Sequence, residues 1–293
     1  MDVLMQQIVS GLATGSIYAS LALALVMIYK ATDVVNFAQG EMAMFATYLC
    51  WSMLQAGLPY WVAFGATLVI AFAGGVLIER VVIRPVERAP LLSILIVTIG
   101  LLTIFNSLAG WIYSYVQKPF PSPFPAAPLT VGGVTFGAHD LGQIGVTLVA
   151  LLAIFAFFRF TPLGLAMRAA AQNPVSSRLV GIRVGWMLAL GWGLAAMFGA
   201  VAGMLIAPTL FLDPNMMGSV QIYAFAAATL GGFSSPVGAV IGGLSVGVIE
   251  NLTGTYVKFI GTDLKFSVAL IIILIVLVVK PAGLLGRRAV RRV

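Results

Sequence analysis

The sequence predicts an all-α fold, a polytopic transmembrane helical bundle of about eight or nine spans, some of them broken or re-entrant. Hydrophobic residues make up 61% of the 293 residues, charged residues only 9%, and the mean hydropathy is +1.07. A water-exposed surface needs far more charge than this. Apolar runs long enough to cross the hydrocarbon recur along the chain, so we expect a single transmembrane domain over residues 1–293 and no soluble domain.

Nine apolar runs are bounded by charge, proline or polar clusters. The first follows a start, MDVLMQQIVS, that lacks the basic residues of a cleaved signal peptide, so we expect it to remain as a span. The last three are shorter and rich in glycine, and with eight crossings one of them would be re-entrant. The predicted runs are 5–29, 41–56, 61–78, 91–113, 143–160, 187–208, 219–232, 237–252 and 267–279.

Arginine gathers at the ends of these runs rather than along one solvated face, which argues against nucleic acid as a partner despite a pI near 9.8. Short cytoplasmic loops collect arginine and lysine, so the clusters set the orientation. We expect an external N-terminus, a cytoplasmic C-terminus and an extended, proline-rich external loop over 114–142. The clusters are Arg80, Arg84 and Arg88; Arg159, Arg168, Arg178 and Arg183; and Arg287, Arg288, Arg291 and Arg292.

The stretch GLAMRAAAQNPVSSRLVGIR at 164–183 carries three arginines and no acid. Thr161 and Asn173 can each cap a helix through a side-chain oxygen. A proline follows each of them, at a position that suits the first residue of a helix. Gly181 can end the second helix in a left-handed conformation. We predict two short cytoplasmic helices separated by a bend, with small side chains that another protein can approach closely. The alternative is a basic loop that only sets topology.

Polar residues inside or beside apolar runs are the candidates for a translocation pathway. Asn36, Gln39, Gly40 and Glu41 interrupt the apolar character between the first two runs. This cluster resembles the broken helices of transport sites, whereas Glu41 alone could be an acid at a helix start near the cytoplasmic interface.

Three further polar residues belong to the same prediction. Glu250 and Asn251 lie near the end of a glycine-rich run. Glu250 could line a polar cavity or make a contact between helices, and the sequence does not decide between these two interpretations. Asn106 lies within the fourth run. We therefore predict that all three are pathway residues.

Glycines spaced by four let helix backbones approach one another in lipid. GLATG (Gly11, Gly15), GAVAG (Gly199, Gly203), GAVIG (Gly238, Gly242) and GLSVG (Gly243, Gly247) have this spacing and predict tight bundling.

No enzymatic or metal-binding constellation is visible in the sequence. GLSVG matches a serine-hydrolase elbow around Ser245, but the single histidine, His139, lies in the external loop and the site is a helix interior. One histidine without nearby cysteines or a carboxylate pair supplies too few ligands for a metal site. We expect no cofactor and no metal, and Cys50 is expected to be a small core residue.

Five motifs together resemble one family. NFAQGEM at 36–42, IERVVIRPV at 78–86, the block from 168 to 181, LGGFSSPVGAVIGG at 230–243 and KPAGLLGR at 280–287 are similar to the permease subunits of branched-chain amino acid ABC importers. The resemblance runs from about residue 11 to residue 287. In this sequence Gln39 stands where many relatives would be expected to have histidine.

The resemblance implies a subunit of the bacterial inner membrane, with a periplasmic N-terminus, that contacts membrane lipid and translocates branched-chain or other hydrophobic amino acids. Its implied partners are a second related permease, two ABC ATPases and a periplasmic binding protein. The 161–185 segment then resembles the element that couples to an ATPase. The residues in that role are Gly164, Arg168, Ala169, Gln172, Asn173, Arg178 and Gly181.

The sequence supports this division of labour. The chain contains no Gly-Lys dipeptide and therefore no Walker A loop, so ATP must be hydrolysed by a partner. Two alternatives remain: the same kind of importer carrying urea, amides or another small solute, and an ion-coupled carrier that would use Glu41 and Glu250.

Overall fold

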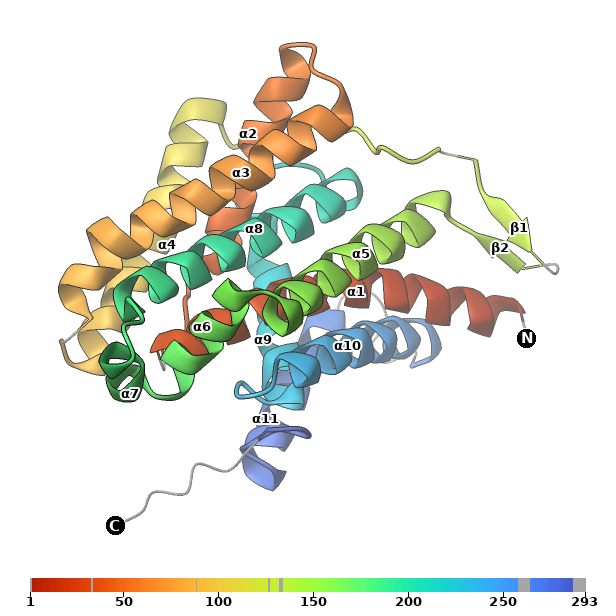
Figure 1. The fold of residues 1–293 in the computed structure, drawn as a ribbon. Helices are drawn as coiled ribbons and strands as arrows, with labels where there is room; N and C mark the ends of the chain where they lie inside the picture. Colours follow the sequence, from red (N-terminus) through yellow and green to blue (C-terminus); the bar gives the residue numbers. More distant parts are fainter. Residues whose placement is uncertain are drawn as a thin grey trace. The chain divides into compact units, whose positions relative to one another are not determined.

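The computed structural model describes residues 2–32, 34–87, 89–125, 127–131, 134–257 and 264–286. It is built almost entirely of helices, which confirms the predicted all-α class (Figure 1). The chain divides into two compact units. Unit 1 comprises Met1–Val26, Ser122–Gly145 and Ser219–Val293, and unit 2 comprises Met27–Pro121 and Val146–Gly218.

The helices follow the predicted runs closely. They are α1 (Asp2–Thr32), α2 (Gln39–Gln55), α3 (Tyr60–Ile78), α4 (Leu91–Tyr113), α5 (Ala138–Phe160), α6 (Pro162–Gln172), α7 (Pro174–Leu179), α8 (Val184–Leu210), α9 (Met217–Gly231), α10 (Pro236–Tyr256) and α11 (Lys265–Val279). After α3 the chain continues as a π-helical turn, Glu79–Ile83, and a 3₁₀ turn, Arg84–Val86. All nine predicted runs are helical.

Six helical stretches within the described residues are long and apolar enough to cross a membrane. They are Val3–Lys30, Tyr60–Val86, Leu91–Tyr113, Ala138–Phe160, Val184–Leu210 and Pro236–Tyr256. Helices α2, α9 and α11 have 17, 15 and 15 residues, at or below the lower limit of about 17 residues for a full crossing. These six stretches and three shorter helices are consistent with the predicted polytopic bundle.

Two predicted limits are wrong. Helix α5 begins at Ala138 rather than at 143, because Asp140 lies in its first turn and His139 hydrogen-bonds Gln143 one turn later, at 2.7 Å. Helix α10, predicted as a short run, has 21 residues, because Ser235 caps it through the N–H of Gly238 and its glycines are tolerated inside a packed helix.

The segment predicted as an extended external loop is mostly non-helical as far as the structure describes it. Strands β1 (Leu129–Val131) and β2 (Val134–Phe136) pair antiparallel, with Leu129 opposite Phe136. The last residues of the predicted loop belong to the first turn of α5.

The core of unit 2 is built by α8 packing against α3 and α2. A side chain at Gly75 would meet the backbone carbonyl oxygen of Trp192 at 2.6 Å and the Ala196 methyl group at 2.8 Å. Further along α8, a side chain at Gly203 would meet the backbone oxygen of Ala43 at 2.8 Å. These glycines therefore set the close approach of three helices.

The predicted glycine spacing acts in the same way in unit 1, where α1 packs on α10. A side chain at Gly11 would meet the Val248 backbone at 2.8 Å, and one at Gly15 would meet the Gly243 carbonyl oxygen at 2.9 Å. Gly247 in turn faces the Gly15 backbone. The prediction of tight bundling is confirmed.

Candidate coupling and translocation sites

The segment between α5 and α8 folds as the predicted pair of short helices. The Thr161 hydroxyl accepts a hydrogen bond from the Gly164 backbone N–H at 3.0 Å and caps α6. The Asn173 side chain accepts one from the Ser176 N–H at 3.0 Å and caps α7. Asn173 is extended, with φ −148° and ψ 91°, so the chain bends there. Both predicted helix starts are confirmed.

Gly181 ends the pair with φ +85°, in the predicted left-handed conformation. Ala170 on α6 is buried against Val184 and Leu188 of α8, so α6 is anchored on the transmembrane core of unit 2.

Most of the predicted coupling residues lie at the surface. Arg168, Gln172, Asn173, Arg178 and Gly181 are exposed and Ala169 is half-buried. The exception is Gly164, which is buried because the backbone at the end of α5 occupies the space where a side chain would lie. Gly164 therefore shapes the entry into α6 and presents no surface.

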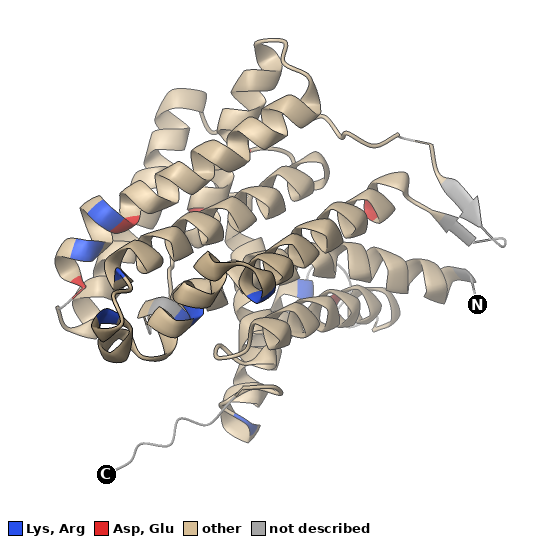
Figure 2. Ribbon diagram, in the orientation of Figure 1, with Lys and Arg blue, Asp and Glu red and all other residues tan. Residues whose placement is uncertain are grey.

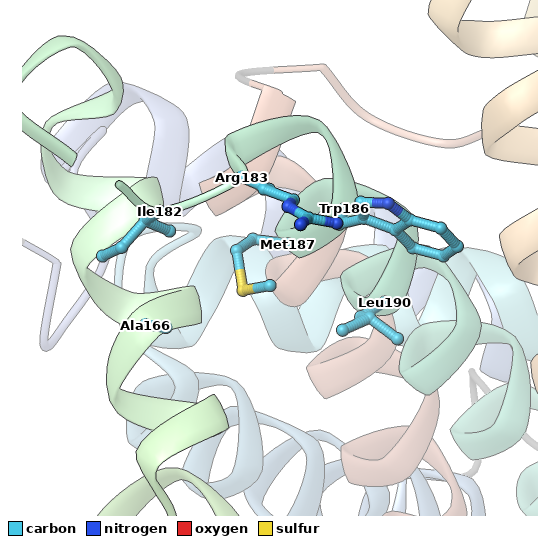
Figure 3. Close-up of a pocket in the computed structure, with 6 residues that line it drawn as sticks. All are labelled: Ala166, Ile182, Arg183, Trp186, Met187 and Leu190. Atoms are coloured by element: carbon cyan, nitrogen blue, oxygen red, sulfur yellow. The ribbon is translucent and has the colours of Figure 1, made fainter. Parts of the chain in front are cut away.

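The helix pair also exposes apolar side chains. Val175, Leu179 and Val180, in and just after α7, are 68%, 83% and 75% exposed. Beside α6 lies a pocket of about 380 Å³ (Figure 3). Its lining residues are Ala166, Ile182, Arg183, Trp186, Met187 and Leu190. Apolar patches rimmed by arginine are typical of surfaces that contact another protein.

The end of α3 is tied to the start of α8. The Arg80 guanidinium lies 3.3 Å from the centre of the Trp186 ring, and the Arg84 guanidinium occupies the space where a side chain at Gly185 would lie. The described arginines of the first two clusters lie just after α3, at the end of α5, in α6 and α7 and just before α8, and we call this the arginine-rich end of unit 2. Figure 2 shows Lys and Arg in blue, with several blue segments at the left of the view. Arg88, Arg287, Arg288, Arg291 and Arg292 lie outside the described residues.

Helix α2 begins far from that arginine-rich end. The Gln39 amide donates to the backbone oxygen of Ala195 at 2.9 Å, near the middle of α8. Asn36 donates to the Gln39 side chain at 3.3 Å and accepts from the Ala38 N–H. Asn36, Gln39 and Gly40 are all buried. Helix α2 is therefore a helix of 17 residues whose polar start lies inside unit 2.

Glu41, in the first turn of α2, lies beside the Asn106 amide of α4 and within electrostatic range of Asp213. Asn106 is about 22 Å along α4 from its start at Leu91, because a helix rises about 1.5 Å per residue. Asp213 follows the far end of α8. Glu41 therefore lies at a helix start, as the alternative interpretation predicted, and its neighbours lie toward the opposite end of unit 2 from the described arginines.

A turn after α8 holds this acidic cluster together. Asn106 donates to the carbonyl oxygen of Pro214 at 2.8 Å and to the Asn215 side chain at 3.1 Å. The Asn215 N–H donates to Asp213 at 2.7 Å, and Gln117 donates to the same carboxylate at 3.5 Å.

Aromatic residues continue the contact between α2 and α4. Phe45 lies against Phe105, with ring centroids 5.4 Å apart, and Tyr48 stacks on Tyr113 at 4.4 Å. Glu41, Phe45, Tyr48 and Ser52 are spaced by three or four residues and share one face of α2. This face forms an aromatic and polar seam with α4.

The candidates in unit 1 form a separate set of contacts. The Tyr18 hydroxyl of α1 donates to Glu250 of α10 at 2.8 Å, and the Tyr223 ring of α9 stacks on Tyr18 at 4.8 Å. Asn251 donates to the backbone oxygen of Gln7 at 2.7 Å. Glu250 and Asn251 therefore join helices of unit 1, which favours the interhelical contact over the polar cavity.

Comparison with known proteins agrees with this architecture. The family model described as the branched-chain amino acid transport system permease component matches residues 7–279. The chain belongs to this family. Three relatives of the permease bear the words "high-affinity branched-chain amino acid transport system permease protein" in their names.

LivH of Salmonella typhimurium and LivH of Escherichia coli K12 are each 32% identical to the permease, over 99% of its length and 97% of theirs. BraD of Pseudomonas aeruginosa is 31% identical, over 99% and 98%. A solved structure, PsaBC from Streptococcus pneumoniae in complex with Fab, shares the fold with a TM-score of 0.50 and 14% identity, over 93% of the permease and 91% of that chain.

Sequence reasoning missed several residues of these clusters in the permease. Asp213 lies in a short loop, and an isolated acid there has no signal of its own. Tyr18, Tyr48 and Tyr223 lie in apolar helices, where tyrosine is common. A scan for polar side chains on the same helical face as Glu41 would have found Tyr48.

Proposed function

We propose that the permease forms the membrane pathway of a bacterial inner-membrane ABC importer for branched-chain or other hydrophobic amino acids, delivered by a periplasmic binding protein. Membership of the permease family and the names of the relatives support this function. As a transporter subunit the permease is not an enzyme. ATP hydrolysis would take place on two ABC ATPase subunits, and a second related permease would complete the pathway.

The observation that carries the coupling role is the capped helix pair of α6 and α7. Two side-chain caps fix both helix starts, and α6 is anchored on α8 through Ala170. The pair presents Arg168, Arg178 and an exposed apolar patch. A docked ATPase can therefore transmit its movement to α5 and α8, the helices on either side of the pair.

The pathway role rests on the buried polar start of α2 and on its contacts with α4. A helix that begins inside the membrane places polar backbone and side-chain groups where solute must pass. Asn36, Gln39, Gly40, Glu41 and Asn106 are the residues that we propose for the pathway. Glu250 and Asn251 join α10 to α1 within unit 1.

Crosslinking tests the coupling role in the assembled importer. Cysteine variants of Ala169, Gln172 and Ser176 should form crosslinks to the ATPase. A Val149→Cys variant is the matched control, because Val149 is 67% exposed in the middle of α5, away from both helix ends. The native Cys50 is fully buried and can remain.

Crosslinks confined to other loops, with none from the three positions in α6 and α7, would contradict the coupling role. Uptake of leucine by vesicles that contain all the subunits, with ATP and the binding protein, tests the transport function itself. A complex that assembles but takes up no hydrophobic amino acid would rule out the proposed cargo.

A further inference from the structure

We propose that Glu41 and Asp213 bind the ammonium group of an amino acid in transit, with its aliphatic side chain against Phe45 and Phe105. This inference rests on the proposed function and adds the chemical group that the membrane pathway recognises. It concerns one end of unit 2, where α2, α4 and the turn after α8 meet.

The two carboxyl groups reach this place from different parts of the chain, and Asn106 connects them. The Asn106 amide lies beside Glu41, and it also holds the turn that carries Asp213 through Pro214 and Asn215. A single ligand group can therefore lie between two acids that are 172 residues apart in the sequence.

Two buried polar atoms of the cluster have no hydrogen-bond partner. Glu41 is 6% exposed and its Oε2 atom is unpaired, and Tyr48 is fully buried with an unpaired hydroxyl. Tyr48 lies two turns from Glu41 on the same face of α2 and within electrostatic range of Asp213. Buried polar atoms nearly always have a partner, so these two indicate a ligand with N–H donors.

The negative charge of the Glu41 and Asp213 carboxylates favours a cationic ligand. Within the described residues neither Glu41 nor Asp213 forms an ion pair with lysine or arginine. Lys118, which pairs with Leu212 through its backbone, places its ammonium nitrogen 5.0 Å from the centre of the Trp51 ring. An ammonium group offers three N–H donors, enough for both carboxylates and the Tyr48 hydroxyl oxygen.

Aromatic rings beside the acids suit the rest of the cargo. The rings of Phe45 and Phe105 are in contact, and Phe45 lies between Glu41 and Tyr48 on α2. An aliphatic side chain gains by covering these faces, while the ammonium group meets the carboxylates. Urea and neutral amides lack the ammonium cation, so this site discriminates against them.

Ligand binding by the complete importer in lipid nanodiscs, without binding protein or nucleotide, tests the inference. Leucine and 3-methylbutylamine should raise the thermal unfolding midpoint of the wild type. The keto acid 4-methyl-2-oxopentanoate and urea should not, because both lack the ammonium group. Glu41→Gln and Asp213→Asn should each weaken leucine binding at least about tenfold.

The matched control is Glu87→Gln, an exposed acid at the arginine-rich end, which should bind leucine like the wild type. Asp213→Asn keeps a side-chain oxygen that can accept the hydrogen bond from the Asn215 N–H, so the turn should keep its structure. If Glu41→Gln fails to assemble, the leucine affinity of Asp213→Asn decides the test. Assembly with the ATPase is measured by size-exclusion chromatography for each variant.

The inference is overturned if leucine leaves the unfolding midpoint of the wild type unchanged, or if the keto acid or sodium chloride alone raises that midpoint as much as leucine does. It is also overturned if Asp213→Asn binds leucine like the wild type. Leucine uptake in the presence of binding protein and ATP is measured on the same preparations. Uptake without ammonium-dependent binding rejects only this inference, whereas absence of uptake rejects the proposed function.

Discussion

Individual polar side chains in the apolar helices have two kinds of surroundings. Asn36, Gln39 and Asn251 are hydrogen-bonded to neighbouring side chains or to backbone oxygens. Gln39 and Asn251 join two helices in this way, and Asn36 stabilises the start of α2. Glu41 and Tyr48 keep an unpaired buried oxygen. The first kind stabilises the fold, and the second kind leaves a place for a ligand.

The hydrogen bond from Tyr18 to Glu250 provides a test at this scale. Tyr18→Phe removes the donor and leaves a partly buried carboxylate short of a partner, which should cost about 1–3 kcal/mol of stability. The thermal unfolding midpoint in detergent should fall. Tyr256→Phe on α10 is the control, because Tyr256 is 53% exposed. Equal midpoints for the two variants would show that the Tyr18 bond contributes nothing.

The sequence identifies polar residues but not their partners. Asn36, Gln39, Glu41, Asn106 and Glu250 stand out because polar groups are rare in apolar runs. Except for Asn36, their partners come from distant segments, and those contacts arise only when helices pack. The role of Glu41 could not be read from its own stretch, since only the packing of α2 on α8 shows that this helix begins in the interior.

At the scale of single elements, local chemistry predicts helix starts well and helix lengths less well. Thr161 and Asn173 cap α6 and α7 as expected, since a cap depends on residues within one turn. The extra length of α10 and the early start of α5 depend on packing and on loop contacts. Glycine spacing predicts close helix contacts but does not specify the partner helix.

Two adjacent glycines of α3 test the helix packing. Gly75→Leu should separate α3 from α8, because the new side chain meets the Trp192 backbone and Ala196, and the cost should be about 1–3 kcal/mol or more. Gly74→Leu is the matched control, since no heavy atom lies within 4 Å of a side chain added there. Thermal unfolding and yield of the folded permease measure the difference. Equal stability of the two variants would refute the close contact.

At the scale of the whole molecule, each unit is assembled from separate parts of the chain. Unit 1 combines three segments and unit 2 combines two, and helices α1, α5 and α9 contribute residues to both. Neither unit can therefore form from one continuous stretch of sequence. The family relationship covers residues 7–279 and so includes both.

The arginine-rich end of unit 2 predicts the orientation in the membrane. With that end in the cytoplasm, Ser176→Cys in intact cells should react with a membrane-impermeant maleimide only after permeabilisation. Ser122→Cys, in the exposed segment before β1, should react from outside without it. The opposite pattern would reverse the proposed orientation, with the N-terminus then in the cytoplasm.

The buried start of α2 also has a consequence for biogenesis. Gln39 binds a backbone oxygen that is synthesised 156 residues later. At about 5–20 residues per second, roughly 8–30 s pass on the ribosome between the two. During this interval the polar start of α2 has no α8 to receive it, so insertion of α2 to its final depth must be completed after the later helix has left the translocon.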